Sequence, residues 1–406
     1  MEVVELGEDI VFSTLERLSS DIFVSREVLR PDYVPESLPH REREIKALTE
    51  HIAPIIRGER PSNIFIYGLT GTGKTAVVKY VTNRVSQFAA KKGLNHLSIA
   101  YVNCRHEDTT YRALTELALS LGVKVPFTGL STAEVFKRFK EALNRAGNVL
   151  VAVLDEVDFL VKKNGDDLLY RLTRINSELR GGKVSLIGIT NDVRFTETLD
   201  PRVKSSLGEV EMVFSPYDAD QLRDILMERA SRAFKPGVLE DGVIDYCASI
   251  AAREHGDARR ALDLLRVAGE IAERENAKKV TVRHVKEARY EIERNMIIDV
   301  AKTLPFHGKL VLLVIALGGG KFNSTGDLYI KYRELARGLG AEPVTQRRVS
   351  DIISELDMLG IVTARVINRG RYGKTREVVL NVDPNTLIKA FKDDARLAWI
   401  FKNDRY

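Results

Sequence analysis

The residues with the most recognisable chemistry lie in the run N-I-F-I-Y-G-L-T-G-T-G-K-T, from Asn63 to Thr75. This run contains the pattern G-x-x-x-x-G-K-T, in which glycines allow backbone N–H groups to approach phosphate oxygens. Lys74 supplies a positive charge, and Thr75 supplies a hydroxyl for Mg²⁺. So short a pattern also occurs by chance, but here an apolar strand pattern precedes it and a helical pattern follows it, from about Thr75 to Phe88. The sequence therefore predicts a nucleotide site at the N-terminus of that helix.

Two acidic residues follow an apolar run that has the composition of a buried strand. The run is Val149–Leu154, and Asp155 and Glu156 come directly after it. Ligands of open α/β sheets bind at the carboxyl ends of the strands, so both carboxylates are expected near the phosphates. In a phosphate-binding fold the first would hold Mg²⁺ and the second would polarise the attacking water. Such a pair is common by chance alone, and the phosphate-binding pattern makes it informative.

Further polar residues follow the next predicted strand, Val184–Ile189. Asn191 can hydrogen-bond both a γ-phosphate and the attacking water, although asparagine also ends strands for local reasons. After it, Arg202 and Lys204 are expected in an outward-facing loop. Each is either placed to act on the nucleotide of a neighbouring subunit or simply solvated.

A second candidate cation for the nucleotide lies in a helical region that begins at Pro216. There the sequence H-G-D-A-R-R-A-L puts Asp257 at a helix start, with Arg259 and Arg260 in the first turn. Cations at this position oppose the helix dipole, which favours a charged ligand, and a salt bridge to a nearby acid is the alternative.

Three prolines, Pro31, Pro35 and Pro39, impose an extended path between Arg30 and His40. A rigid segment of this kind just before a nucleotide fold is either a plain linker or one wall of a base-binding slot.

The sequence of the C-terminal part predicts three helices followed by a hairpin, which is the pattern of a winged helix. Thr345 caps the third helix, whose apolar stripe recurs at i, i+3, i+4 and i+7. Its other face carries polar residues, namely Gln346, Arg347, Arg348, Ser350 and Ser354. The strands Ile361–Ile367 and Glu377–Val382 form the hairpin.

The hairpin turn concentrates positive charge around an aromatic ring. Its cations surround Tyr372 and are Arg369, Arg371, Lys374 and Arg376. Such charges repel one another unless phosphates neutralise them, so DNA is favoured over a merely solvated tip.

The whole chain fits a multidomain intracellular protein. Its 406 residues carry a net charge of +5, and the composition is 44% hydrophobic, with no apolar run long enough to span a membrane and no secretory signal. Two distant cysteines, Cys104 and Cys247, suggest neither a disulfide framework nor a zinc site, which fits a reducing cytosol. We expect a lead-in at 1–30, an α/β domain with a parallel sheet at 31–215, a helical domain at 216–300 and a third unit at 301–406.

The order of these features resembles the AAA+ ATPases of the initiator group. More narrowly, the chain is similar to the archaeal proteins related to both the origin recognition complex and its helicase-loading partner. The resemblance runs from Y-V-P-E-S-L-P-H-R-E-R-E-I at residue 33 to the hairpin, which is nearly the whole chain. It implies an α/β P-loop AAA+ domain with a helical lid, followed by a C-terminal winged-helix domain.

The resemblance also implies a role for each matching residue. Asp155 would hold Mg²⁺ together with Thr75, Glu156 would act on the water, Asn191 would be the first sensor and Arg259 the second. The phosphates would be held by Gly71, Thr72, Gly73, Lys74 and Thr75.

Three further residues stand at positions that act on nucleotide in this family. A P-Y turn and a lid helix touch the nucleotide in such proteins, which here points to Tyr217 and Arg229. Arg202 stands where an arginine finger is expected, although Ser205-Ser206 follows where the family motif usually continues S-R.

The family also inserts a helical element between the second strand and the D-E strand, which contacts DNA beside the winged helix. The candidate here lies between Cys104 and Leu130. It offers phosphate donors, namely Arg105, Thr109, Thr110, Tyr111 and Arg112.

The function that the resemblance implies is an ATP-regulated replication initiator that binds double-stranded origin DNA and helps recruit or load the replicative helicase. ATP or ADP and Mg²⁺ would be its cofactors, with slow hydrolysis acting as a switch. Further initiator subunits on DNA would be partners, the location would be the cytoplasm at the nucleoid, and no membrane would be involved. The alternatives are an ATPase-gated winged-helix transcription regulator and a clamp-loader-like remodelling ATPase. The G-D-x-R helix and the inserted helices favour the initiator over the first, and the basic wing favours it over the second.

Overall fold

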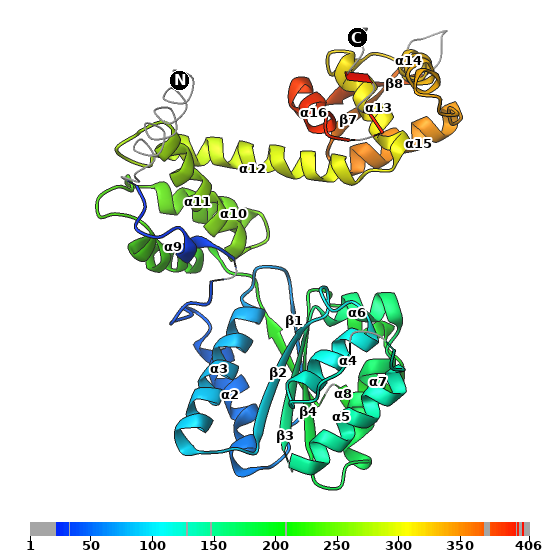
Figure 1. Ribbon diagram of the computed structural model, residues 1–406. Helices are drawn as coiled ribbons and strands as arrows, with labels where there is room; N and C mark the ends of the chain where they lie inside the picture. Colours follow the sequence, from blue (N-terminus) through cyan, green and yellow to red (C-terminus); the bar gives the residue numbers. More distant parts are fainter. Residues whose placement is uncertain are drawn as a thin grey trace, which may run out of the picture. The chain divides into compact units, whose positions relative to one another are not determined.

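The computed structural model describes residues 22–31, 33–126, 129–146, 148–207, 209–368, 374–394, 396–397 and 400–401 (Figure 1). The chain divides into two compact units, Met1–Lys286 and Glu287–Tyr406. In the described part of the chain, no helix combines the length and apolar character needed to cross a membrane. Cys104 and Cys247 are both buried and free.

A parallel sheet forms the centre of the first unit. Its strands are β1 (Ile64–Gly68), β2 (Leu97–Asn103), β3 (Val149–Asp155), β4 (Lys183–Thr190) and β5 (Val210–Phe214). The strand order is β2-β3-β4-β1-β5, and every neighbouring pair is parallel. Because all the strands run the same way, the residues after β1, β3 and β4 meet at one edge of the sheet.

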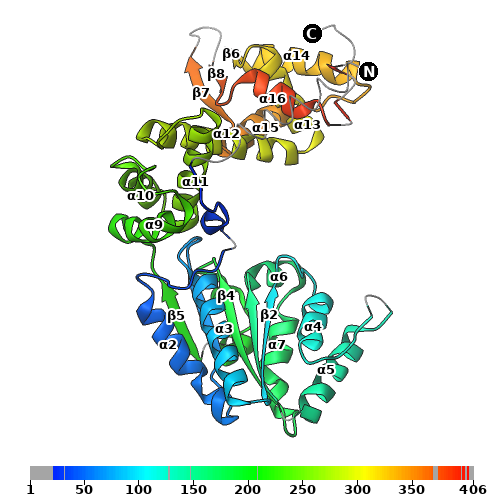
Figure 2. The same ribbon diagram turned by 60° about the vertical axis from the view of Figure 1, so that its left-hand side comes forward.

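Helices cover both faces of this sheet because its strands are apolar on both sides. On one face α2 (Glu42–Ile52) and α3 (Lys74–Lys92) share a core with Ile64 and Ile66, whereas Phe65 points into the core on the other face. Figures 1 and 2 show these two helices on the side of the sheet opposite α4, α5 and α7. The helices of that second side and of the β4–β5 connection are α4 (Thr110–Leu119), α5 (Thr132–Ala146), α6 (Val157–Asn164), α7 (Asp167–Arg174) and α8 (Pro201–Leu207).

A helical lid completes the first unit. It contains α9 (Ala219–Ala233), α10 (Val243–Arg253) and α11 (Ala258–Arg274), and α12 (Val282–Thr303) runs from this unit into the second. The N-terminal segment packs on the lid: Phe23 stacks on Phe234 with ring centroids 4.8 Å apart, and the N–H of Val24 donates to the carbonyl of Ala233 at 2.8 Å. This segment is therefore part of the lid's packing, in addition to leading into the sheet domain.

The second unit is a winged helix. Its helices are α13 (Phe306–Leu317), α14 (Thr325–Gly338), α15 (Gln346–Met358) and α16 (Pro384–Phe391), and its antiparallel sheet has the order β6-β8-β7, formed by Lys321–Phe322, Lys374–Leu380 and Val362–Asn368. Thr345 caps α15 by accepting a hydrogen bond from the N–H of Arg348. The stripe Val349, Ile352, Ile353 and Leu356 is buried, as the periodicity predicts.

Several elements differ from the sequence-based expectation. The sequence leaves the helices between Cys104 and β3 undivided, whereas the structure divides them into α4 and α5, with α4 ending just before Gly122, which adopts φ +76°. Arg202 and Lys204 lie on α8 and not in a loop, since Pro201 at the first helical position favours a helix start. The short elements β5, β6 and α16 were not expected. β5 has only five residues and a mixed burial pattern at the sheet edge, which gives a weak periodic signal.

Candidate functional site

The predicted phosphate-binding run forms a tight loop between β1 and α3. Gly71 and Gly73 adopt φ values of +73° and +90°, a region that a side chain disfavours, and α3 begins at Lys74. The Nζ atom of Lys74 donates to the carbonyl oxygens of Gly68 and Leu69 at 2.8 and 2.7 Å. Burial lowers the pKa of Lys74 to about 8, with the nearby Asp155 opposing that shift. A phosphate group in the loop would favour the charged form of this lysine.

The two carboxylates lie beside this loop at the end of β3. Asp155 is 3% exposed, and its Oδ2 atom accepts from the Thr75 hydroxyl at 2.9 Å and from the Tyr101 hydroxyl at 2.5 Å. Its Oδ1 accepts from the backbone N–H of Glu156 at 2.9 Å. Glu156 has φ +54°, unusual for a residue with a side chain, at the turn that leads into α6. The oxygen donors of Thr75 and Asp155 fit the ligand preference of Mg²⁺.

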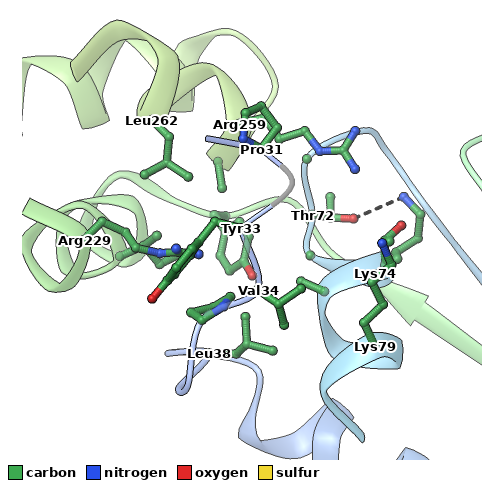
Figure 3. Close-up of a pocket in the computed structure, with 18 of the residues that line it drawn as sticks. Pro31, Tyr33, Val34, Leu38, Thr72, Lys74, Lys79, Arg229, Arg259 and Leu262 are labelled. Carbon is green, nitrogen blue, oxygen red and sulfur yellow. Dashed lines mark hydrogen bonds between the residues drawn. The ribbon is translucent and has the colours of Figure 1, made fainter. Parts of the chain in front are cut away.

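One pocket brings together most of the residues predicted to handle nucleotide. It is lined by the phosphate loop, by Asp155 and Glu156, by Asn191 after β4, and by Arg259 of the lid. Figure 3 shows the Arg259 side chain extending from the lid toward the loop that carries Thr72 and Lys74. Two acids, one amide and two cations from four separate segments thus face one cavity.

The lid reaches the phosphate loop through the start of α11. Asp257 caps this helix by accepting from the N–H groups of Arg259 and Arg260 at 2.8 and 3.2 Å. Ala258, the first residue of α11, donates its N–H to the carbonyl oxygen of Gly71 at 3.2 Å. Of the two arginines, Arg260 pairs with Glu254 at 2.9 Å, and Arg259 is the one that lines the pocket.

The proline-rich segment forms an apolar wall of the same pocket (Figure 3). Pro31, Tyr33, Val34 and Leu38 face Leu262 of the lid across it. An apolar space between these walls suits a nucleobase. The proline-rich segment therefore lines the pocket, as expected for one wall of a base-binding slot, and is more than a linker.

Arg229 and Tyr217 both line the pocket, but each is also engaged in holding the fold. Arg229 is 7% exposed, donates to the carbonyl of Val28 at 3.0 Å and stacks over the ring of Tyr33 at 4.7 Å. Burial lowers its pKa. Tyr217 is 5% exposed and lies against Gly73.

Sequence reasoning assigned no role to Arg41, which joins these parts. Arg41 is 3% exposed, and its guanidinium lies 3.9 Å from the ring centroid of Tyr217 and donates to the carbonyls of Thr72 at 2.9 Å and Ser215 at 2.7 Å. It therefore ties the phosphate loop to the strand that leads into the lid. The only signal in the sequence is an arginine at the start of a helix after a proline-rich segment, which is too common a pattern to indicate this role.

Arg202 does not reach this pocket. It is exposed on α8, and its Nε lies 3.3 Å from Asp200 Oδ1. An exposed cation there is available to a neighbouring molecule and not to the nucleotide pocket of its own chain.

Comparisons with known proteins agree with this architecture. The AAA domain model matches residues 56–195, the Cdc6 AAA+ ATPase-type lid domain matches 223–290, and the CDC6 C terminal winged helix domain matches 299–390. The chain is 58% identical to ORC1-type DNA replication protein 1 of Sulfurisphaera tokodaii over 394 residues, which are 96% of this chain and 98% of that one. It belongs to the ORC1-type DNA replication proteins.

Two solved structures extend the comparison. The Aeropyrum pernix ORC1 protein, solved in complex with DNA, is 57% identical with a TM-score of 0.79, over 94% of this chain and 100% of that one. The Aeropyrum pernix ORC2 protein, solved as ADPNP-ADP complexes, shares the fold at 24% identity with a TM-score of 0.61, over 93% of this chain and all of that one. Membership in the ORC1-type family confirms the predicted AAA+ domain, lid and winged helix, and it favours the initiator over both alternatives.

The first candidate DNA surface of this ORC1-type protein lies at the predicted insertion. Arg105 is exposed, and its guanidinium stacks over the ring of Phe159 at 6.0 Å. Arg112 is exposed on α4, 3.6 Å from Asp108. These contacts hold both cations at the surface without burying them.

The second candidate DNA surface lies on the winged helix. Gln346, Arg347 and Arg348 are exposed at the start of α15, and Ser350 is half-buried. Arg348 pairs with Glu355 at 2.9 Å, and Arg376 donates to the Ser354 hydroxyl at 2.6 Å. β7 and β8 pair as far as Asn368 and Lys374. The wing residues Arg369, Arg371 and Tyr372 and the side chain of Lys374 lie outside the described residues.

Proposed function

We propose that this ORC1-type protein is an ATP-regulated initiator that binds double-stranded origin DNA and helps recruit or load the replicative helicase. One combination of features carries the proposal. A pocket with the residues needed to bind and read a nucleoside triphosphate lies in the same chain as a winged helix, and the solved relative at 57% identity is a complex with DNA.

The pocket residues divide the work of nucleotide binding. The phosphate loop and Lys74 hold the phosphates, and the apolar wall formed by Pro31, Tyr33 and Leu38 receives the base. Thr75 and Asp155 would hold Mg²⁺, which supplies charge neutralisation between the phosphates. A nucleoside triphosphate differs from a diphosphate by its γ-phosphate, which would lie at Asn191 and Arg259.

Hydrolysis is proposed to be slow and to serve as a switch. Glu156 would orient the attacking water, and Arg259 would sense the γ-phosphate from the lid. A charge supplied by a second subunit accelerates such reactions by roughly 10³–10⁵-fold. Arg202 is exposed on α8 outside its own pocket, so it can meet a nucleotide only when another initiator subunit lies beside it.

The DNA would be held by two surfaces. One is Arg105 and Arg112 near α4, and the other is the exposed start of α15 together with the wing. Phosphate contacts give sequence-independent affinity, whereas a helix in the major groove can read base edges.

The proposal is tested by footprinting the full chain on origin and promoter duplexes with ATP, ADP or no nucleotide. We expect protection of origin DNA, and retention of the purified replicative helicase on that DNA that differs between ATP and ADP. Equal protection of origin and unrelated duplexes, or helicase retention that is independent of this protein, contradicts the proposal.

A further inference from the structure

We propose that Tyr101 is a positioning residue for Asp155, and that its hydroxyl orients the carboxylate that takes Mg²⁺. The inference rests on the proposed nucleotide and Mg²⁺ site and adds to it a residue outside the motifs described above. The observation behind it is the 2.5 Å hydrogen bond between Tyr101 Oη and Asp155 Oδ2.

The sheet register explains how this contact arises. β2 and β3 are parallel neighbours, with Tyr101 opposite Val153 and Asn103 opposite Asp155. Side chains two residues apart on a strand share a face, so Tyr101 and Asp155 are diagonal neighbours on one face of the sheet. An aromatic side chain can span that diagonal, and the phenol reaches the carboxylate.

Tyr101 completes the set of hydrogen bonds that fixes the carboxylate. Oδ1 of Asp155 accepts from the N–H of Glu156, and Oδ2 accepts from both Thr75 and Tyr101. A carboxylate has about four lone-pair sites, so these three donors leave about one, on Oδ1, for the proposed Mg²⁺ site. Without the phenol, Asp155 would have a donor fewer and more freedom to rotate about its terminal bond.

The phenol itself is held as a donor. The Nζ atom of Lys79 lies 4.6 Å from the centroid of the Tyr101 ring, which restrains the side chain from the α3 side. A tyrosine hydroxyl is protonated at neutral pH, so it can donate this hydrogen bond to the carboxylate.

A merely structural role is less consistent with the surroundings of the ring. Tyr101 is 37% exposed and is a member of neither hydrophobic core that flanks the sheet. Removing one hydroxyl there should leave the packing of the first unit intact. Groups that hydrogen-bond a metal ligand typically change metal affinity by about 10–100-fold when removed.

The test compares Tyr101→Phe with the matched control Tyr67→Phe in the full chain. Tyr67 also donates to a carboxylate, that of Glu211 at 2.9 Å. This pair joins β1 and β5, at the edge of the sheet opposite β2. The readouts are ADP affinity in EDTA, and Mn²⁺ affinity of the ADP complex from the electron paramagnetic resonance signal of free Mn²⁺. Neither readout requires hydrolysis.

We expect Tyr101→Phe to weaken Mn²⁺ binding by about 10-fold while ADP affinity in EDTA stays at the wild-type value. Tyr67→Phe should change neither quantity. In an Asp155→Asn background, Tyr101→Phe should add nothing, because the partner that it orients is already altered.

Two results overturn the inference: wild-type Mn²⁺ affinity in Tyr101→Phe, or an equal loss in Tyr67→Phe. Failure of the proposed function looks different, since wild-type protein would then bind no ADP in either condition. A melting curve on each variant shows that the comparison is made on folded protein.

Discussion

The backbone N–H of Ala258 in the lid donates a hydrogen bond to the carbonyl oxygen of Gly71 in the phosphate loop, at 3.2 Å. Asp257, the cap of the same lid helix, lies so close that a Cβ atom on Gly71 would be 1.8 Å from its Oδ1. The lid helix therefore starts directly on the predicted phosphate-binding loop, so a ligand that moves this loop should also move the lid.

Gly71→Ala should weaken both nucleotide binding and lid closure. The new methyl group meets Asp257, and the backbone at φ +73° disfavours any side chain. We expect faster proteolysis between β5 and α9 together with lower ADP affinity. Gly93→Ala is a matched control, with a similar φ of +66° and open space around it. If both variants behave alike, strain alone accounts for the effect and the lid contact is unimportant.

Lys74→Ala and Glu156→Gln should separate binding from hydrolysis. Losing a charged hydrogen-bond donor to phosphate costs about 1.5–3 kcal/mol, so the first variant should bind ATP about 10-fold more weakly or worse. The second keeps the phosphate contacts and loses the base, so turnover should fall by about 100-fold or more at unchanged affinity. Calorimetric titration and single-turnover hydrolysis measure the two quantities. The same loss of ATP affinity in both variants would refute this division.

Arg259 and Arg260 form a natural matched pair, because they are adjacent in α11 and have different surroundings. Arg259→Ala should alter hydrolysis and the nucleotide-dependent protection of the lid from protease, with little change in melting temperature, because Arg259 faces the pocket. Arg260→Ala removes the partner of Glu254 and should lower the melting temperature with little change in hydrolysis. The reverse pattern would show that Arg259 is not the sensor.

Arg41→Met should damage both stability and nucleotide binding. The substitution leaves the carbonyls of Thr72 and Ser215 without their donor, and an unsatisfied buried acceptor costs about 1–3 kcal/mol. Urea unfolding gives the stability change, and ADP titration at low temperature gives the affinity of the folded variant. Arg43→Met, at an exposed position of α2, is the control. Normal ADP affinity in folded Arg41→Met would show that Arg41 supports the fold alone.

DNA binding should respond differently to the α15 and wing cations. Arg347→Ala should cost about 1–3 kcal/mol mainly on the preferred origin site, if this arginine reaches a base edge. Arg371→Ala should weaken binding to all duplexes and lower the slope of log affinity against log salt by about 1. Titrations on origin and scrambled duplexes at several salt concentrations distinguish these effects. Wing variants with wild-type affinity and an unchanged slope would exclude the wing as a DNA surface.

The sequence predicted the parts of the site that depend on residues close together in the chain. The glycines of the phosphate loop, the D-E pair and the Thr345 cap are each encoded within a few residues, and the structure places them as expected. The residues that were missed depend on partners far along the chain. Arg41 meets Ser215, 174 residues away, and Tyr101 meets Asp155, 54 residues away. Neither periodicity nor composition indicates which distant atom a side chain will reach.

Weak elements were missed for a related reason. β5 lies at the edge of the sheet with only Met212 and Phe214 buried, so its pattern of alternation is short. α8 was assigned to a loop because its seven residues are too few to show a helical period. Tertiary packing, and not local sequence preference, decides such segments.

The packing of the N-terminal segment on the lid has a consequence for how the protein is made. Arg229 donates a hydrogen bond to the carbonyl of Val28, 201 residues earlier, and the same segment continues into the apolar wall of the pocket. During synthesis, the segment around Val28 must therefore wait until α9 has emerged before it finds its place. Contacts of such long sequence separation cost loop-closure entropy, which slows folding. We therefore expect the nucleotide pocket to be complete only after α9 has emerged, and ADP binding during translation would report that stage.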